Sequence, residues 1–200
     1  KMLRDSGVPT ADWTIARSIE EIDYDKIEEM GYPVFIKPNS GGSSVATFKV
    51  ECREDVEEAV RAGLEVDDVV MIEAYLPGDE YTSFVLDGEV YPTIKISSPT
   101  GFFDFESKYS TGANAAKEEI VYLEEDLQEQ INKASKTVWD IFYCRAYVRV
   151  DFILSNGKFY VLELNTLPGM TTTSLIPRSA NAKGLSYSEL VDKIMETSIK

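Results

Sequence analysis

Histidine is absent from the 200 residues of this chain. Its absence excludes Ser–His and Cys–His nucleophilic catalysis and removes the commonest protein ligand of transition metals. Cysteine is scarce: Cys52 and Cys144 lie far apart and form no CxxC pair, so neither a disulfide framework nor a zinc site is predicted. Chemistry must therefore come from carboxylates, lysines, arginines, hydroxyl groups and metal ions that prefer oxygen.

Basic residues are also few. Lys and Arg total 20 against 35 Asp and Glu, a formal net charge of −15, which would repel a nucleic-acid backbone, so no nucleic-acid partner is expected. No apolar run approaches the roughly 20 residues that span a bilayer, and no charged-then-apolar leader opens the chain. We therefore expect no membrane partner and a cytoplasmic location.

The chain is 44% hydrophobic, enough to bury a sizeable core. Helical and strand periodicities are mixed along it, and Asp87-Gly88 is typical of a hairpin turn. Strands are predicted at 13–17, 32–37, 44–50, 69–76, 80–86, 90–96 and in the segment 148–165, and helices at 24–30, 53–66, 124–144 and 186–199. Residues 97–119 show no period. This order predicts an α+β fold in two small lobes, residues 1–76 and 77–200.

The segment "VRVDFILSNGKFYVLELNTLPGM" places polar side chains at alternate positions of two apolar strands. Arg149 and Asp151 share a face of the first strand, and Glu163 and Asn165 share a face of the second. A two-residue Asn156-Gly157 loop would set Asp151 opposite Leu162 and turn Glu163 to the other face. We predict instead a three-residue loop, 155–157, that brings all four polar groups to one face.

Two carboxylates and an amide oxygen that converge in this way predict a Mg²⁺ site at Asp151, Glu163 and Asn165. The alternative is a solvated face of an edge hairpin with an Arg–Asp ion pair. After the turn at 168–169, a run of Thr and Ser offers hydroxyl and backbone N–H groups to an anion.

A second candidate site lies in "FIKPNSGGSSV". Lys37 ends a strand, and the Gly-rich loop after it lets backbone amides approach a phosphate while Ser43 and Ser44 add hydroxyl groups. The loop is not a Walker sequence, and an ordinary hairpin turn is the alternative. Lys108 and Tyr109 lie in the aperiodic tract, where a lone lysine is most often solvated.

Together and in order, these pieces resemble the D-alanine–D-alanine ligase family of the ATP-grasp superfamily. The residues that carry the resemblance are "VFIKPNSGGSSV", "EAYLPGDEYT", "FDFESKYS" and "RVDF…LELNTLPGMTTTSLIP". The resemblance spans essentially all 200 residues and implies two α+β lobes that grip ATP between antiparallel sheets.

The resemblance implies a role for each matching residue. For the nucleotide these are Lys37, the Ser44 hydroxyl of the Gly-Ser loop, the backbone of Ala74, Tyr75 and Leu76 at the adenine, Glu73 at its amino group, Glu80 at the ribose and Lys108 at the phosphates. For two Mg²⁺ ions, with Mn²⁺ as an alternative, they are Asp151, Glu163 and Asn165. Ser43 and Tyr109 would close the loop, Arg149 and Gly169 would stabilise an oxyanion, and Ser174 and Leu175 would bind the second amino acid.

The implied reaction joins two D-alanines through a D-alanyl phosphate, for peptidoglycan precursor synthesis. Tyr109 favours an amino acceptor over lactate, while D-Ser remains open as the acceptor. A non-catalytic nucleotide-binding module is the alternative from another class.

Two departures from the family accompany the resemblance. Ala46 stands where glycine is usual, and the family's N-terminal lobe, which binds the first D-alanine and builds much of the homodimer, has no counterpart here. We therefore expect nucleotide binding at most, and negligible ligation, from these 200 residues alone.

Overall fold

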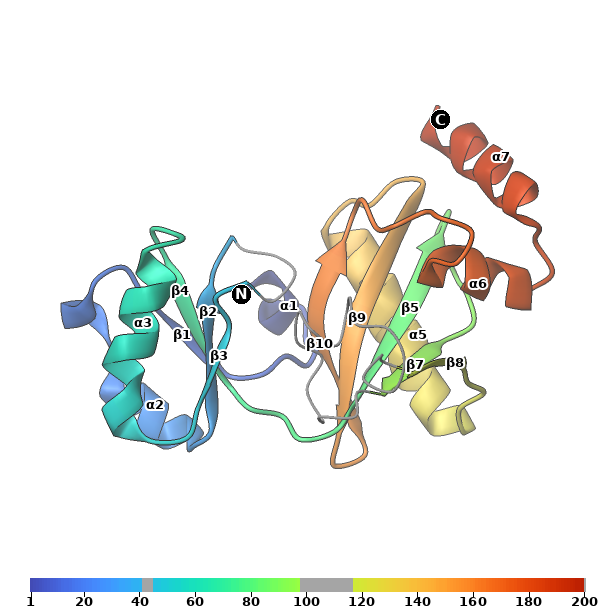
Figure 1. The fold of residues 1–200 in the computed structure, drawn as a ribbon. Helices are drawn as coiled ribbons and strands as arrows, with labels where there is room; N and C mark the ends of the chain where they lie inside the picture. The colour runs from blue at the N-terminus through green and yellow to red at the C-terminus, as the bar shows by residue number, and fades with distance from the viewer. Residues whose placement is uncertain (41–44, 98–116, 200) are drawn as a thin grey trace. The chain divides into compact units, whose positions relative to one another are not determined.

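The computed structural model describes residues 1–40, 45–97 and 117–199. By their contacts these residues divide into two compact units, one of residues 11–76 and one of residues 1–10, 77–97 and 117–199. Each unit is built on an antiparallel sheet (Figure 1). We call them the four-stranded unit and the six-stranded unit.

The four-stranded unit has helices on one face of its sheet (Figure 1). Its strands, in the spatial order β1-β4-β2-β3, are β1 (Trp13–Ala16), β4 (Val70–Ala74), β2 (Val34–Pro38) and β3 (Phe48–Val50). Its helices are α2 (Tyr24–Met30) and α3 (Val56–Leu64), with short 3-10 turns η1 (Ile19–Glu21) and η2 (Arg53–Asp55).

Alternation along the strands separates the two faces of this sheet. The fully buried core side chains are Ile27, Val34, Ile36, Val56, Val60, Val70 and Ile72, from α2, β2, α3 and β4. The side chains between them, among them Lys37 and Glu73, lie on the other face and stay partly exposed.

The six-stranded unit contains the longer strands. Its sheet has the order β10-β9-β5-β7-β8, with β6 paired to β5. The strands are β5 (Asp79–Leu86), β6 (Glu89–Val90), β7 (Ile94–Ser97), β8 (Lys117–Ile120), β9 (Tyr147–Ser155) and β10 (Lys158–Asn165). The helices are α1 (Met2–Asp5), α5 (Glu125–Ile141), α6 (Leu175–Ala182) and α7 (Tyr187–Ser198).

Separate cores lie on the two faces of this sheet. Ile131 and Val138 of α5 pack with Val150 and Phe152 of β9 on one face. Phe84, which is two residues from Thr82 and directly opposite Arg149, belongs to the other face and packs with the α6 and α7 core. The face that carries Arg149 is therefore covered only in part by helices.

The first ten residues pack with the six-stranded unit, unlike the expected division at residues 1–76 and 77–200. Val8 is 5% exposed in the core beneath α5. The Pro9 carbonyl accepts a hydrogen bond from Val161 N–H at 2.8 Å, on the edge strand β10. Two interactions explain why these residues pack here: Val8 buries its apolar side chain, and Pro9 satisfies a backbone N–H group on the edge strand β10. That the two units are the lobes of an ATP-grasp enzyme stays a prediction.

Most elements predicted from periodicity are confirmed, but α1, η1, β8 and α6 were missed. β8 falls in the tract 97–119 to which no element was assigned, and α6 follows the Thr/Ser run without having been predicted. The strand expected at 44–50 is only Phe48–Val50, because Ala46 lies in a turn with φ +53°. Glycine adopts that conformation more readily than alanine, so Ala46 introduces backbone strain into this turn.

Among the helices in the described ranges, none combines the length and the apolar character that a bilayer span requires.

Gly78, directly before β5, lies close to the backbone at the end of β9. Its φ is +156°, and a Cβ there would lie 1.9 Å from the Leu154 carbonyl oxygen. Gly78→Ala should lower the free energy of unfolding by at least about 3 kcal/mol, because backbone must move. Urea titration followed by Trp139 fluorescence in a Trp13→Phe background measures it.

Gly157→Ala is the matched control, since φ is +75° but a Cβ would meet nothing within 4 Å. It should cost only about 1–2 kcal/mol of left-handed strain. Equal losses in the two variants would contradict the predicted close approach at Gly78.

Candidate active site

The turn of the β9–β10 hairpin differs from the predicted one. Ser155 pairs with Lys158, so the loop has two residues, Asn156 and Gly157. Both have positive φ, 50° and 75°, as a type I′ turn requires. The three-residue loop was wrong because Asn-Gly satisfies this turn directly and leaves Ser155 in the strand.

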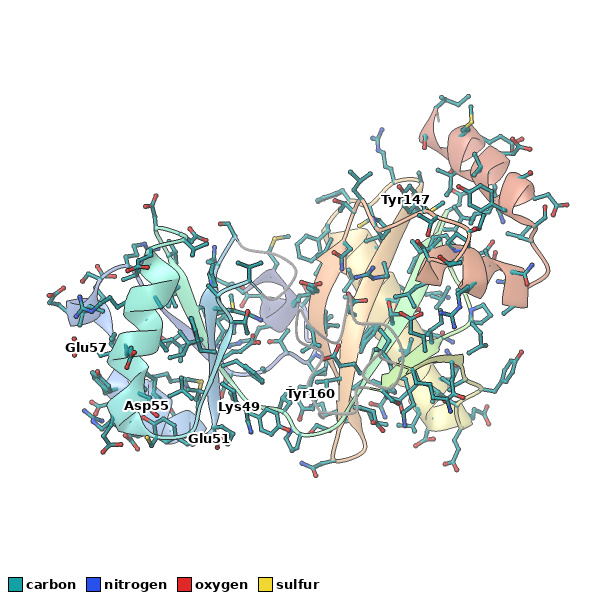
Figure 2. The ribbon with its side chains drawn as sticks, viewed as in Figure 1. Lys49, Glu51, Asp55, Glu57, Tyr147 and Tyr160 are labelled. Atoms are coloured by element: carbon teal, nitrogen blue, oxygen red, sulfur yellow. The ribbon has the colours of Figure 1, made fainter. Side chains whose placement is uncertain are left out.

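The four polar groups nevertheless share one face, because a bulge inside β10 corrects the register. Pairing shifts between Val161 and Glu163, and Leu162 is the extra residue. Beyond the shift, Glu163 lies opposite Asp151 and Asn165 lies opposite Arg149. Figure 2 labels Tyr147 and Tyr160, which lie on the same face on either side of this polar group.

Asp151 is the centre of the group, and among the described residues its hydrogen bonds come from β5, β10 and β9 itself. Its Oδ1 accepts from Thr82 Oγ1 at 2.6 Å and from Arg149 Nε at 2.9 Å. Its Oδ2 accepts from Arg149 Nη2 at 2.7 Å and from Asn165 Nδ2 at 2.9 Å. The bidentate arginine and the two further donors hold the plane of the carboxylate.

Arg149 stays charged although its side chain is only 21% exposed. Burial acts to lower its pKa, but the hydrogen bonds and charge of Asp151, with Glu163 and Glu118 contributing, raise the pKa above the ordinary value. The Arg149 guanidinium is therefore a permanent positive charge on the sheet face that carries Asp151 and Glu163.

The donor set suits a hard cation. Asn165 Nδ2 also lies 3.2 Å from Glu163 Oε1, so the amide touches both carboxylates. Within the described residues no three His, Cys, Asp or Glu side chains gather, and Asn165 adds an amide group beside the two carboxylates. The two carboxylates outnumber the single guanidinium, and oxygen donors with net negative charge fit Mg²⁺.

On the four-stranded sheet, Lys37 and Glu73 form an ion pair with Nζ and Oε1 2.5 Å apart. Phe35 lies directly opposite Glu73, so all three share the face that the helices leave open. Lys49, opposite Phe35 on β3, pairs with Glu51 and lies over the Tyr75 ring (labelled in Figure 2 are Lys49 and Glu51). This face therefore presents two ammonium groups beside aromatic rings.

At the end of β4, two backbone N–H groups donate hydrogen bonds within the protein. Ala74 N–H donates to the Asp12 carbonyl at 2.8 Å, and Tyr75 N–H donates to the Pro33 carbonyl at 3.3 Å. These two donors are therefore satisfied within the protein, whereas the Leu76 N–H has no backbone acceptor among the described residues.

Residues 169–175 form a compact turn at the start of α6. Ser174 precedes the helix, and its Oγ lies 3.0 Å from Thr171 N and 2.8 Å from Thr171 Oγ1. A Cβ on Gly169 would lie 3.2 Å from Ser174 Oγ. Leu175 is the first residue of α6, and the N–H groups of a first helical turn favour an anion.

Comparison with known proteins identifies the family. Residues 2–196 match the family described as D-ala D-ala ligase C-terminus. The chain belongs to the D-alanine–D-alanine ligase family. Over all 200 residues it is 48% identical to D-alanine–D-alanine ligase B of Clostridium perfringens and 46% identical to a D-alanine–D-alanine ligase of Clostridium botulinum (strain Hall). The chain spans 66% of the length of each relative.

Solved structures agree with the assignment of the chain to this family. A D-alanine–D-alanine ligase from Bacillus anthracis matches 99% of this chain, with 40% identity and a TM-score of 0.86 over 64% of its own chain. A structure of the Bacillus anthracis ligase complexed with ATP matches with a TM-score of 0.85, 36% identity and 63% coverage. The VanG D-Ala:D-Ser ligase of Enterococcus faecalis matches 98% of this chain at 26% identity, with a TM-score of 0.81 over 58% of its own. The predicted α+β ATP-grasp fold is thereby confirmed.

Of the remaining predicted site residues, one lies on the described sheet and four lie outside the described residues. Glu80 lies on β5 opposite Ile153, on the same face as Asp151. Ser43, Ser44, Lys108 and Tyr109 lie outside the described residues, and their roles stay predictions.

Two polar residues near these groups were missed. Thr82 faces Asp151 from β5, and its signal was that Glu80 and Thr82 fall on the same face of that strand. Lys49 was also missed. It directly precedes the buried Val50 in β3, and because neighbouring side chains of a strand point to opposite faces, Lys49 lies on the exposed face.

A double-mutant cycle tests whether Arg149 and Asp151 act as a unit. Arg149→Leu leaves the largely buried carboxylate of Asp151 without its positively charged partner, whereas adding Asp151→Asn removes the negative charge as well. Denaturant unfolding should give a coupling free energy of about 2 kcal/mol.

The exposed pair Arg61–Glu57, 2.7 Å apart with 61% and 51% exposed side chains, serves as the control. Arg61→Leu with Glu57→Gln should show no resolvable coupling, because solvent screens the pair. A coupling at Arg149–Asp151 no larger than this control would contradict the interpretation.

Proposed function

We propose that this chain is the ATP-binding and phosphoryl-transfer part of an enzyme that joins two D-alanines through a D-alanyl phosphate. The observation that carries the proposal is the convergence of Arg149, Asp151, Glu163 and Asn165 on one face of the sheet, in a chain of the D-alanine–D-alanine ligase family. The four-stranded unit and the six-stranded unit, which includes residues 1–10, would be the two ATP-grasp lobes.

For the nucleotide, the proposal assigns Lys37 to the phosphates and Glu73 to the adenine amino group. The 2.5 Å Lys37–Glu73 pair supports it, because each side chain neutralises the other on an open sheet face until a ligand engages them. The segment Ala74, Tyr75 and Leu76 would follow the adenine edge, with Leu76 N–H as the donor. Glu80 would meet the ribose, and Lys108 and Ser44 the phosphates. The ATP complex of the Bacillus anthracis ligase supports ATP as the nucleotide.

For metal ions, the proposal assigns Asp151, Glu163 and Asn165 as ligands of two Mg²⁺ ions. Bound there, Mg²⁺ would neutralise the charge of the transferring phosphoryl group. Arg149 would supply a further positive charge without titrating, because Asp151 holds its pKa high.

The reaction needs two displacements. A carboxylate oxygen of the first D-alanine attacks the γ-phosphorus and the bond to ADP breaks; the amine of the second then attacks the acyl carbon, loses a proton and expels phosphate. Arg149 and the Gly169 amide would stabilise the oxyanion of the second step. Ser174 and the Leu175 N–H would hold the acceptor carboxylate, and the first turn of α6 supports this. Ser43 and Tyr109 would close the site to water.

The acceptor is proposed to be D-alanine. The relatives at 46–48% identity are D-alanine–D-alanine ligases, whereas the D-Ala:D-Ser ligase matches at 26%. D-Ser stays the alternative, because one hydroxyl group is a small difference for a pocket to reject. As an enzyme of peptidoglycan precursor synthesis, the protein would act in the cytoplasm as a homodimer.

Nucleotide binding is tested by the melting temperature of the chain with Mg-ADP, compared with Mg²⁺ alone and with ADP plus EDTA. Binding to the native state adds RT ln(1 + [L]/Kd), about 2.7 kcal/mol at a hundred times Kd. We expect a metal-dependent rise that Glu163→Gln abolishes and that Glu129→Gln, at an exposed position of α5, leaves intact. A rise unaffected by Glu163→Gln would refute the metal assignment.

Ligation is tested by mass spectrometry with Mg-ATP and equal D-alanine, D-serine and D-lactate. The chain alone should form negligible product. A chimaera that adds the unmatched N-terminal third of the Clostridium perfringens relative should form D-Ala-D-Ala in excess. Mostly mixed D-Ala-D-Ser product would favour the alternative acceptor, and product from the chain alone would contradict the need for the added segment.

A further inference from the structure

Thr82 makes a contact that the proposed roles leave unexplained. Its side chain is 3% exposed, and its Oγ1 lies 2.6 Å from Asp151 Oδ1 and 3.4 Å from the Val150 carbonyl oxygen. A hydroxyl group has one proton to donate, and the short contact with the carboxylate is the stronger of the two. Thr82 therefore donates to Asp151.

The position of Thr82 makes it a rigid support. It lies on β5, which pairs with β9 on one side and β7 on the other, and its partners there are Asp151 and Ile94. A β-branched side chain has few χ1 rotamers, and a strand paired on both edges holds the backbone. The hydroxyl is thus presented to Asp151 from a fixed point outside the β9–β10 hairpin.

The other two donors to Asp151 have competing tasks if the proposed function holds. Arg149 is assigned to the developing oxyanion, and Asn165 is assigned to the metal through its oxygen, which turns its Nδ2 away from Asp151. Thr82 has no such second task. We propose that Thr82 is a positioning residue that keeps the Asp151 carboxylate oriented for the divalent cation when Arg149 and Asn165 engage their ligands. This inference rests on the proposed function.

Mn²⁺ binding to the 200-residue chain in the presence of ADP tests it, with free Mn²⁺ measured by electron paramagnetic resonance. Thr82→Val keeps the shape of the side chain and removes the donor. Loss of a group that orients a metal ligand typically weakens metal affinity 10–100-fold, so we expect Kd for Mn²⁺ to rise at least about tenfold. Thr82→Ser, which restores the hydroxyl, should recover most of the affinity.

Thr93 provides the matched control. Its side chain is fully buried in the same unit, and its hydroxyl has no hydrogen-bond partner among the described residues. Thr93→Val makes the same chemical change away from Asp151, so Kd for Mn²⁺ should stay within about twofold of the parent chain. If Thr82→Val fails to fold, Thr82→Ser and Thr82→Ala, which differ only in the hydroxyl, replace it in the comparison.

The outcomes separate this inference from the proposed function. Weaker Mn²⁺ binding in Thr82→Val or Thr82→Ala, with recovery in Thr82→Ser and none of the effect in Thr93→Val, supports the inference. Parent-like affinity in Thr82→Val, while Glu163→Gln abolishes binding, overturns the inference and leaves the metal site standing. A parent chain that binds no Mn²⁺ with ADP overturns both.

Discussion

The register of the β9–β10 hairpin is the constraint on which the candidate site depends. Asn156-Gly157 starts the pairing in a register that would send Glu163 away from Asp151. The extra residue at Leu162 then reverses the alternation, so Glu163 and Asn165 return to the face of Arg149 and Asp151. Because a one-residue slip exchanges the faces of a strand, the bulge decides whether these groups meet at all.

The same alternation sorts the rest of the six-stranded sheet. Val150 and Phe152, between the polar residues of β9, enter the core beneath α5 and are fully buried. Apolar burial on that face stabilises the strand that carries Arg149 and Asp151 on the other. On the other face, Thr82, Arg149 and Asn165 all donate hydrogen bonds to Asp151, and Phe84 beside them packs with the α6 and α7 core.

The family relationship and the geometry of the site give different kinds of information about this chain. Similarity across all 200 residues places the chain in the D-alanine–D-alanine ligase family, while fold similarity extends to a D-Ala:D-Ser ligase. The shared scaffold therefore does not choose the acceptor. The hydrogen bonds around Asp151 and the Lys37–Glu73 ion pair are the features of this chain on which the proposed phosphoryl-transfer role rests.

Sequence alone determined the α+β class, most strands and helices, and the identities of Arg149, Asp151, Glu163 and Asn165, because alternation and turn residues act locally. It did not determine the turn length and bulge, the placement of Val8 beneath α5, or the helix after Ser174. Thr82 opposite Asp151 was also beyond it, since the two are 69 residues apart. Only tertiary structure decided these, because strand register and the packing of distant residues depend on the whole sheet.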